Sequence, residues 1–582
     1  ACNPFNEVAV AKLRALKHRE EKAFAVMFPE LSDVEEFCEL GDKEKEILTS
    51  PARPIVLLRQ RNIKKDQGCE STVDNNLCFY IDMNMDETEK RFAQNVCCSS
   101  PDIGAMLPCN PLQILLLQLT GPLIMTSGNG SGDVLEIDDE AMVDWLTCRS
   151  GTEELSGVSI LVLSHDRQIL RPLDDSIVKV VRGRRQIIRR ARGYAPSPIP
   201  VGISGECFAA GGDLKSSFCF VKNGFAYLSQ YLGDQVTMSC QNFYKQELSA
   251  MTEIFGFEPQ KIITDKHPGY FSRQVVSEIF EKEVKSSKTQ YQIKSLDGDN
   301  VKNTDNNQHV IFDEIQHHMS HVASVIAEKS LKGKVLGFAF DGTGYGDDGT
   351  IWGSEVFLWD EKKMNRVAHL KPVRLIGGDE GAKNCQTILD GYLFSIKEEL
   401  EAADLKDFIP DNLVTKAISM GINTVTSSSM GRLFDAVSCL LGICDYNTYE
   451  GQVPMKLEWC AKENTSKNLL EDICEDGDTS KLLISIIGAI KAGVDRSKIA
   501  YDFIDIVARF ILKQAQKHID ETRQVVLSGG TFLNRILLER AIDYLEAEGF
   551  EVCISEKVPT NDGGICLGQA YLCEKCAGDI VT

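Results

Sequence analysis

Short apolar segments that alternate with helix-forming segments limit the fold of this chain more than any other feature. In the first 200 residues, residues 8–16 have the pattern of a helix, and residues 23–28 and 54–58 have the pattern of strands. Strands that alternate with helices are typical of α/β units, in which helices cover a sheet. The first part of the chain is therefore predicted to be an α/β unit.

A cluster of prolines marks the first predicted domain boundary. Pro196, Pro198 and Pro200 cannot continue a helix or donate hydrogen bonds to a central strand ladder. The boundary gives two predicted domains, residues 1–198 and residues 199–582. Two polar stretches with little periodicity are predicted loops; they span residues 63–95 and 286–307.

The pattern after the boundary changes to hairpins followed by long helices. Residues 218–221 and 225–228 flank an Asn-Gly pair, which is typical of a hairpin turn. Further strands are predicted at residues 335–341, 352–359 and 524–527, the last of them ahead of a helix at 532–548. Two groups of strands and helices predict a second α/β domain split into two lobes.

Composition excludes several classes of protein. With 582 residues and 43% hydrophobic residues, the chain is long enough for about three or four globular units. The formal net charge of −22 repels polyphosphate backbones, so nucleic acid is not expected as a partner. No apolar run reaches the ~20 residues that span a bilayer, so no membrane contact is expected. Twenty scattered cysteines and no signal peptide predict reduced thiols and a cytoplasmic location.

Two histidines at helical spacing are the first candidate metal ligands. His317 and His321 are four residues apart, so a helix would place both imidazoles on one face, as a divalent metal requires of two ligands from one segment. Asp562, in an Asn-Asp-Gly-Gly stretch, is the candidate third ligand. The alternatives are packed or solvated histidines, and a helix cap for Asp562.

Glycine-rich turns after two apolar strands are further candidates. Asp341 ends the strand at residues 335–341 and opens a loop with three glycines, which suits a metal or a phosphate-bound metal. Gly529 and Gly530 lie between a strand and a helix, where backbone amides attract phosphate. For the loop at Asp341, the alternative is an ordinary glycine-rich hairpin.

Cationic and hydroxyl side chains in the first domain form a candidate site for a triphosphate. Hydroxyls and amides follow the strand at 122–125, where α/β proteins bind ligands. The alternatives are cations that offset a helix dipole, a polar turn, and a solvated edge for the arginine. The candidates are Lys17, Arg19, Lys22, Ser50, Arg53, Ser127, Asn129 and Arg192.

These motifs, in this order, resemble the HypF family of hydrogenase-maturation carbamoyltransferases over nearly the whole chain. Residues 17–28, 50–54, 126–129 and 190–196 resemble its YrdC-like domain; residues 316–321, 341–353, 449–452, 527–534 and 561–569 resemble its transfer domain. The resemblance implies an α/β fold class, with a YrdC-like domain in residues 1–198 and a two-lobed transfer domain of the actin and sugar-kinase type in residues 199–582. The family's N-terminal acylphosphatase and zinc-finger modules, and the first YrdC-like strand, are missing, so a fragment of a longer product is expected.

The resemblance also implies a reaction. The first domain would join carbamate, derived from carbamoyl phosphate, to AMP from ATP with Mg²⁺, and the second would pass the carbamoyl group to the C-terminal cysteine of HypE. One divalent metal, iron or zinc, is implied at the catalytic residues His317, His321, Asp341 and Asp562. Nucleotide contacts are implied for the eight first-domain candidates and for Gly529, Gly530 and Asn534.

Three rival functions remain. One is O-carbamoylation of a small molecule, which the order of the two domains disfavours, because antibiotic O-carbamoyltransferases carry these modules reversed. Another is the related transfer of threonylcarbamoyl to tRNA, which the negative charge disfavours. The third is a non-catalytic scaffold that binds HypE.

Overall fold

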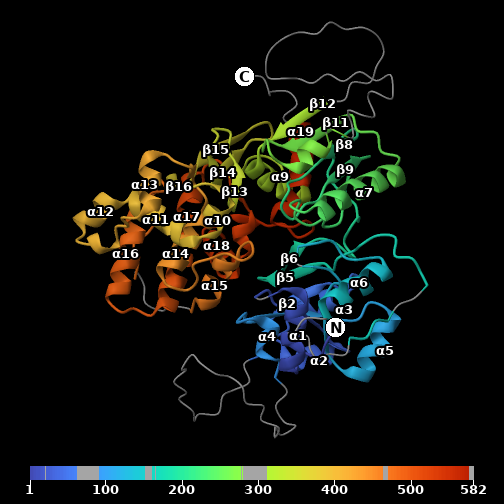
Figure 1. Cartoon of the computed structure of the whole chain (residues 1–582). Coiled ribbons are helices and arrows are strands. Elements are labelled where there is room, and N and C mark those ends of the chain that lie inside the picture. Colours follow the sequence, from blue (N-terminus) through green and yellow to red (C-terminus); the bar gives the residue numbers. More distant parts are fainter. Residues whose placement is uncertain are drawn as a thin grey trace, which may run out of the picture. The chain divides into compact units, whose positions relative to one another are not determined.

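The chain forms two compact units in the computed structural model (Figure 1). The first comprises Ala1–Leu173 and Ile177–Lys179, and the second comprises Asp174–Ser176 and Val180–Thr582. The structure describes residues 1–19, 21–61, 91–130, 132–150, 160–163, 166–276, 278, 311–462 and 469–575. The predicted loop at 286–307 and residues 63–90 of the other predicted loop lie outside these ranges. The loop predicted at 63–95 is wrong at its last two residues, because residues 94 and 95 belong to the short helix α4 (Gln94–Cys97).

The first unit is built on a mixed sheet. Its strands follow the order β4 (Leu123–Met125), β1 (Ala25–Met27), β3 (Asp102–Met106), β2 (Ile55–Arg59) and β5 (Ile177–Val181). The helices are α1 (Glu7–Lys17), α2 (Leu31–Phe37), α3 (Asp42–Thr49), α4, α5 (Pro111–Thr120) and α6 (Asp139–Ser150). The predicted α/β organisation is confirmed, including the helix at 8–16 and the strands at 23–28 and 54–58.

The second unit contains two further sheets, one in each predicted lobe. One has the order β12 (Ile311–Ile315), β11 (Lys261–Asp265), β8 (Cys207–Ala209), β9 (Cys219–Lys222), β10 (Phe225–Leu228) and β7 (Ile199–Pro200). The other has the order β16 (Val373–Ile376), β17 (Thr424–Ser427), β14 (Ile351–Trp359), β13 (Val335–Tyr345), β18 (Gln524–Ser528) and β19 (Glu551–Cys553), and β15 (Met364–Ala368) pairs with β14. The predicted hairpin at 218–228 is confirmed, because β9 and β10 pair around Asn223-Gly224.

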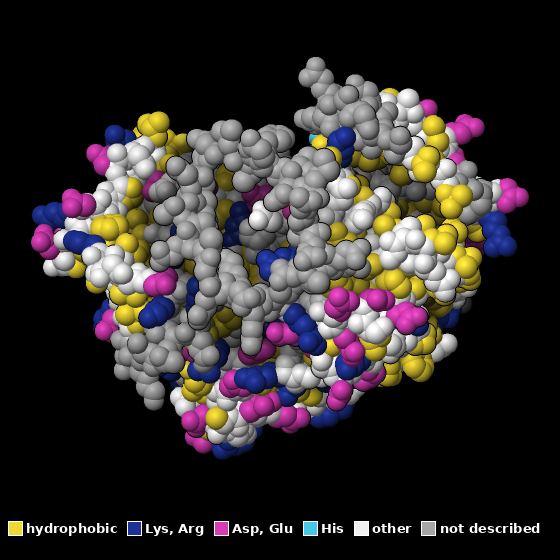
Figure 2. Space-filling view, turned by 90° about the horizontal axis from the view of Figure 1, so that it is seen from below, with side chains coloured by type: hydrophobic (Ala, Val, Ile, Leu, Met, Phe, Trp, Pro, Cys, Tyr) yellow, Lys and Arg dark blue, Asp and Glu magenta, His cyan; other side chains and the backbone are white. Residues whose placement is uncertain are grey.

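Helices of the second unit cover these sheets. Within the described residues, the longest of the helices is α17 (Arg496–Lys517), which packs on α18 (Arg535–Ala547). Further helices include α7 (Met238–Phe255), α9 (His317–Lys329), α10 (Gly378–Lys383), α11 (Cys385–Ser395), α12 (Lys397–Ala402), α13 (Leu413–Met420), α14 (Met430–Leu440), α15 (Gln452–Cys460), α16 (Ser480–Lys491) and α19 (Ile565–Lys575). No described helix has the length and apolar character needed to cross a bilayer. On the face shown in Figure 2, lysine and arginine side chains are interspersed with acidic ones.

Two neighbouring helices join the two lobes of the second unit. α9 and α19 share one apolar cluster with residues of both sheets, including Ala209, Ile263 and Phe357. They approach so closely that a Cβ built on Gly568 of α19 would lie 1.9 Å from the carbonyl oxygen of Ser320 on α9. Only glycine fits at this crossing, which lies one residue before His321.

We predict that Gly568→Ala destabilises the protein by roughly 1–3 kcal/mol, because the added methyl must push two packed helices apart. Gly488→Ala in α16 is the matched control: a Cβ there meets nothing within 4 Å, and alanine is the better helix former by about 1 kcal/mol. Denaturant unfolding of both variants measures the difference. Equal effects of the two substitutions would contradict the close contact.

Candidate metal centre

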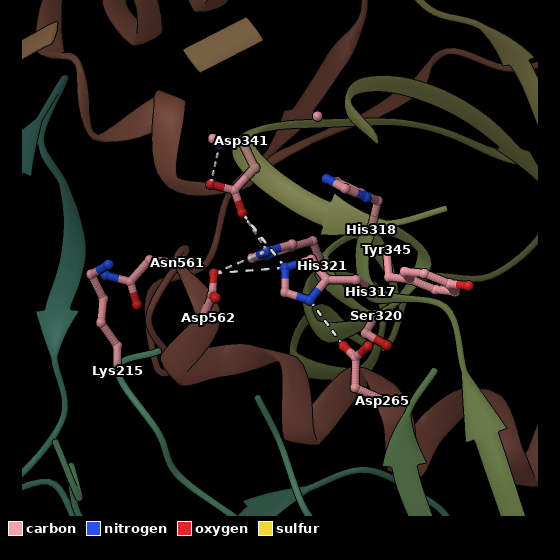
Figure 3. Close-up of polar contacts among 12 residues, drawn as sticks. Lys215, Asp265, His317, His318, Ser320, His321, Asp341, Tyr345, Asn561 and Asp562 are labelled. Atoms are coloured by element: carbon pink, nitrogen blue, oxygen red, sulfur yellow. Dashed lines mark hydrogen bonds and ion pairs between the residues drawn. The ribbon is translucent and has the colours of Figure 1, made fainter. Parts of the chain in front are cut away.

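Four buried side chains from three separate segments converge in the second unit (Figure 3). His317 and His321 come from the first turns of α9, Asp341 from β13, and Asp562 from the short 3-10 helix η4 (Asp562–Gly564). His321 Nε2 lies 3.1 Å from Asp341 Oδ2 and 3.6 Å from Asp562 Oδ1. His317 Nε2 lies 3.7 Å and 3.8 Å from the same two oxygens. The structure thus brings together all four residues that were predicted from the sequence as metal ligands.

Local hydrogen bonds orient the start of α9 and the end of β13. Gln316 caps α9, since its side-chain oxygen accepts from the N–H of Met319 at 2.9 Å. Its amide nitrogen donates to the carbonyl of Tyr345 in β13 at 3.0 Å. The register of β13 against β14 shifts between Phe340 and Gly344. At this irregularity the N–H of Gly342 donates to Asp341 Oδ1 at 2.7 Å, so Oδ2 is the oxygen that faces the histidines.

The turn before α19 leaves Asp562 available to the centre. Asn561 caps η4, because its side-chain oxygen accepts from the N–H of Gly563 at 3.1 Å. A Cβ on Gly564 would lie 2.1 Å from the carbonyl oxygen of Pro559, so the chain can turn here only with glycine. The capping role considered for Asp562 therefore falls to Asn561.

Burial and charge act against each other at the centre. Burial lowers the pKa of His317, but the surrounding carboxylates, led by Asp562, outweigh it and raise that pKa well above its usual value. Burial also opposes the charge on His321, whose pKa is raised by hydrogen bonds with Asp341 and Asp562. The pKa of Asp341 is held well below its usual value by the two imidazoles, although burial raises it. Two carboxyl groups in a buried site are the kind of ligand that a cation binds.

The geometry fits a single divalent ion. The four ligand atoms lie within 4.8 Å of one another. Bonds of about 2.1 Å in a tetrahedral site put neighbouring ligand atoms roughly 3.4 Å apart, close to the observed separations. His317 Nε2 is buried and has no hydrogen-bond partner, which is costly for an imidazole nitrogen unless it binds an ion. Two imidazoles with two carboxylates suit iron or zinc.

An additional acid supports this centre and was not among the sequence candidates. Asp265, at the end of β11, lies with Oδ2 2.9 Å from His317 Nδ1, and its side chain is 1% exposed. A carboxylate on the far nitrogen of a ligating histidine fixes the ring and its tautomer. Residues 261–265 show the same signal that identified Asp341, an apolar strand that ends in an aspartate, and this signal was available in the sequence.

A partly exposed ion pair lies beside Asp562. Lys215 is bonded to Glu450 and lies near Asn561 and Asp562 (Figure 3). Burial lowers the pKa of Lys215, but Glu450 and then Asp562 raise it above its usual value. The ammonium is therefore charged at neutral pH.

The glycine loop predicted to contact nucleotide packs against β13, the strand that carries Asp341. Gly529 has a φ of 101°, and a Cβ there would lie 2.3 Å from the carbonyl oxygen of Phe340. A Cβ on Gly530 would lie 2.9 Å from Asp341 Oδ1. Asn534 caps α18 by accepting from the N–H of Leu537 at 2.9 Å.

In the first unit, three of the predicted nucleotide-binding residues meet. Lys17 Nζ donates to the carbonyl of Ser127 at 2.6 Å and to Asn129 Oδ1 at 2.9 Å. The Ser127 hydroxyl donates to the same Asn129 oxygen at 2.6 Å. The end of α1 and the turn after β4 therefore form one polar cluster.

The other first-domain candidates are placed elsewhere. The Arg19 guanidinium lies 5.0 Å from the ring centroid of Phe24, and the carbonyl of Lys22 accepts from Arg14 at 3.0 Å. Ser50 and Arg53 lie in the turn before β2 and donate to carbonyls of α3. In the register of the sheet, that turn lies at the end of the sheet where β4 starts, whereas Ser127 follows the end of β4 and so lies at the opposite end. Arg192 belongs to the second unit, where it pairs with Asp175 at 2.7 Å.

Family models match nearly the whole chain. The model described as telomere recombination, for Sua5, YciO and YrdC, matches residues 1–78 and 82–191. The HypF Kae1-like domain matches residues 203–328, and the second subdomain of the carbamoyltransferase Kae1-like domain matches residues 337–569. The models thus follow each other along the chain in the predicted order.

Individual proteins are similar over the same length. Carbamoyltransferase HypF of Synechocystis sp. is 31% identical over 98% of this chain and 69% of its own length. The HypF of Rhodobacter capsulatus is also 31% identical, again over 98% of this chain and 69% of its own. A crystal structure of full-length HypF in its phosphate- and nucleotide-bound form superposes with a TM-score of 0.80 at 33% identity, over 99% of this chain and 83% of that one. The HypF of T. kodakarensis also gives 0.80, at 28% identity, over 100% of this chain and 71% of its own.

We predict that Asp265→Asn lowers the affinity of the centre for Zn²⁺ or Fe²⁺ by about 10- to 100-fold, because His317 loses the partner that orients it. Competition with a chromogenic chelator measures the dissociation constant. Asp411→Asn, which changes an exposed carboxylate, should leave that constant within about twofold. Unchanged affinity in Asp265→Asn would show that the ring of His317 is fixed by other contacts.

Proposed function

The chain belongs to the HypF family of carbamoyltransferases, and on that basis we propose that it forms carbamoyl adenylate and transfers the carbamoyl group to the C-terminal cysteine of HypE. The substrates would be ATP, with Mg²⁺, and carbamate derived from carbamoyl phosphate. Residues 1–198 would carry out adenylation, and residues 199–582 the transfer. The observation that carries the proposal is the buried cluster of two histidines, from the region matched by the HypF Kae1-like model, and two aspartates, from the region matched by the second-subdomain model.

For adenylation, the polar cluster around Lys17 supplies the required chemistry. An ammonium held by Ser127 and Asn129 is a fixed cation for the phosphates of ATP. The remaining predicted contacts are Arg19, Lys22, Ser50, Arg53 and Arg192. Attack of carbamate on the α-phosphate would release pyrophosphate and leave a mixed anhydride, whose AMP is a good leaving group.

For transfer, the second unit offers an enclosed and charged site. An iron or zinc ion held by His317, His321, Asp341 and Asp562 would supply Lewis acidity toward the carbamoyl carbonyl. Asp265 would keep the His317 ring in place, and the Lys215 ammonium would attract the phosphate of the adenylate. Gly529, Gly530 and Asn534 would contact the nucleotide. Burial of the centre would keep water from the labile anhydride. The HypE thiolate would then attack the carbonyl, form a thiocarbamate and release AMP.

We predict that His317→Ala reduces carbamoyl transfer to HypE by roughly 100-fold or more, since the metal centre loses one of its ligands. Carbamate-dependent exchange of pyrophosphate into ATP should stay within about twofold of wild type, because His317 has no role in adenylation. His518→Ala, at the end of α17, is the control and should affect neither reaction. Loss of both reactions in His317→Ala, or of neither, would contradict the division between the two domains.

The converse prediction concerns Lys17. Lys17→Ala should reduce the pyrophosphate exchange by roughly 100-fold, because the fixed cation is lost, while transfer from chemically prepared carbamoyl adenylate is preserved. Lys43→Ala removes an exposed lysine paired with Glu46 and should leave both reactions intact.

If HypE is never carbamoylated but a sugar hydroxyl is, the protein is an O-carbamoyltransferase. If wild type catalyses neither reaction yet binds HypE, it is a scaffold.

A further inference from the structure

The segment that leads to Asp562 is tied to α9 at a second point. The backbone N–H groups of residues 556–558 all donate to the carboxylate of Glu328, at N···O distances of 2.9 to 3.2 Å. The Glu328 side chain is fully buried. The next residue, Pro559, has no N–H to offer. One carboxylate therefore accepts the backbone donors of three consecutive residues.

Glu328 shares a helix face with the two histidine ligands. It follows His317 by eleven residues and His321 by seven, which are close to three and two full turns of an α-helix. At 1.5 Å per residue, Glu328 lies roughly 10 Å along the axis from His321. Residues 556–562 therefore run along this face, with residues 556–558 at the C-terminal end of α9 and Asp562 beside the histidines at its N-terminal end.

Further contacts hold the middle of the segment in place. The carbonyl of Thr560 accepts from the N–H of Gly529 at 2.9 Å, and the side chain of Asn561 donates to the carbonyl of Ile188 at 3.0 Å. Val558 is completely buried. These contacts leave the segment between Glu328 and Asp562 little freedom to adopt another path.

We propose that Glu328 is a positioning residue of the metal centre: by binding the amides of residues 556–558 it sets where Asp562 stands relative to His317 and His321. It acts through the backbone and not by contact with the ion. Ionised acceptors form the strongest hydrogen bonds to backbone amides, so a carboxylate fixes this segment more firmly than a neutral side chain. The inference rests on the metal centre of the proposed function and extends it by one residue.

The test compares Glu328→Gln with wild type in binding of Co²⁺, whose visible absorption reports the coordination geometry. The carboxamide keeps the size of the side chain, but it offers one acceptor oxygen and turns an NH₂ toward amides that need acceptors. We expect the Co²⁺ dissociation constant to rise about 10- to 100-fold, with a changed absorption band and a smaller metal-induced rise in the unfolding temperature. Glu328→Asp keeps the carboxylate, and its Co²⁺ dissociation constant should lie between those of wild type and Glu328→Gln. If the glutamine variant does not fold, the aspartate variant is compared with wild type instead.

Glu556→Gln is the matched control, since it makes the same chemical change on the same segment and leaves the backbone N–H in place. Its Co²⁺ affinity should stay within about twofold of wild type. The proposal is overturned if Glu328→Gln binds Co²⁺ with the affinity and the absorption spectrum of wild type. It is also overturned if the substitution lowers the unfolding temperature equally with and without Co²⁺, because Glu328 would then only stabilise the fold in general. If wild type binds no Co²⁺, or if His321→Ala binds it equally well, the metal centre itself fails, whatever Glu328 does.

Discussion

The arrangement of the second unit depends on two buried carboxylates that face two buried imidazoles. Asp341 and Asp562 come from segments more than 200 residues apart in the chain, and both are within 4 Å of His321. Burying such charges without compensation is among the costliest features that a fold can contain. The close packing of α9 on α19, the cap at Gln316 and the sharp turn at Gly564 all maintain this one juxtaposition, and a cation is its natural complement.

Local patterns were enough to predict much of the fold. The hairpin at 218–228 follows from an Asn-Gly turn between apolar runs, and the strand into Asp341 follows from a buried run that ends in an acid; both are properties of a few neighbouring residues. The crossing of α9 and α19 is different. It depends on the close contact between Gly568 and Ser320. A glycine in a helical pattern does not show which distant segment of backbone packs against it.

The same distinction applies to the candidate site. His317 and His321 were predicted from helical spacing, while Asp341 and Asp562 were predicted from their turns and from family resemblance, and the structure brings all four together. Asp265 was missed although the sequence shows the apolar strand that it ends; its contact with His317 depends on the pairing of β11 with β12, which the sequence does not show. Glu328 was not predicted because its partners are backbone amides, and these leave no pattern of residue types in the sequence. In the first unit, Lys17, Ser127 and Asn129 meet, whereas Ser50 and Arg53 lie at the opposite end of the sheet, a separation that depends on strand direction and register.

The burial of the centre also separates how tightly an ion binds from how quickly it exchanges. His317, His321, Asp341 and Asp562 are between 0% and 8% exposed, so an ion among them can depart only when the surrounding chain opens. The rate of exchange is then governed by local opening of the protein and not by the strength of the metal bonds. A chelator in solution would remove such an ion slowly, even where the equilibrium favours the chelator. The metal found in the purified protein would therefore be the one that was available when the protein was synthesised.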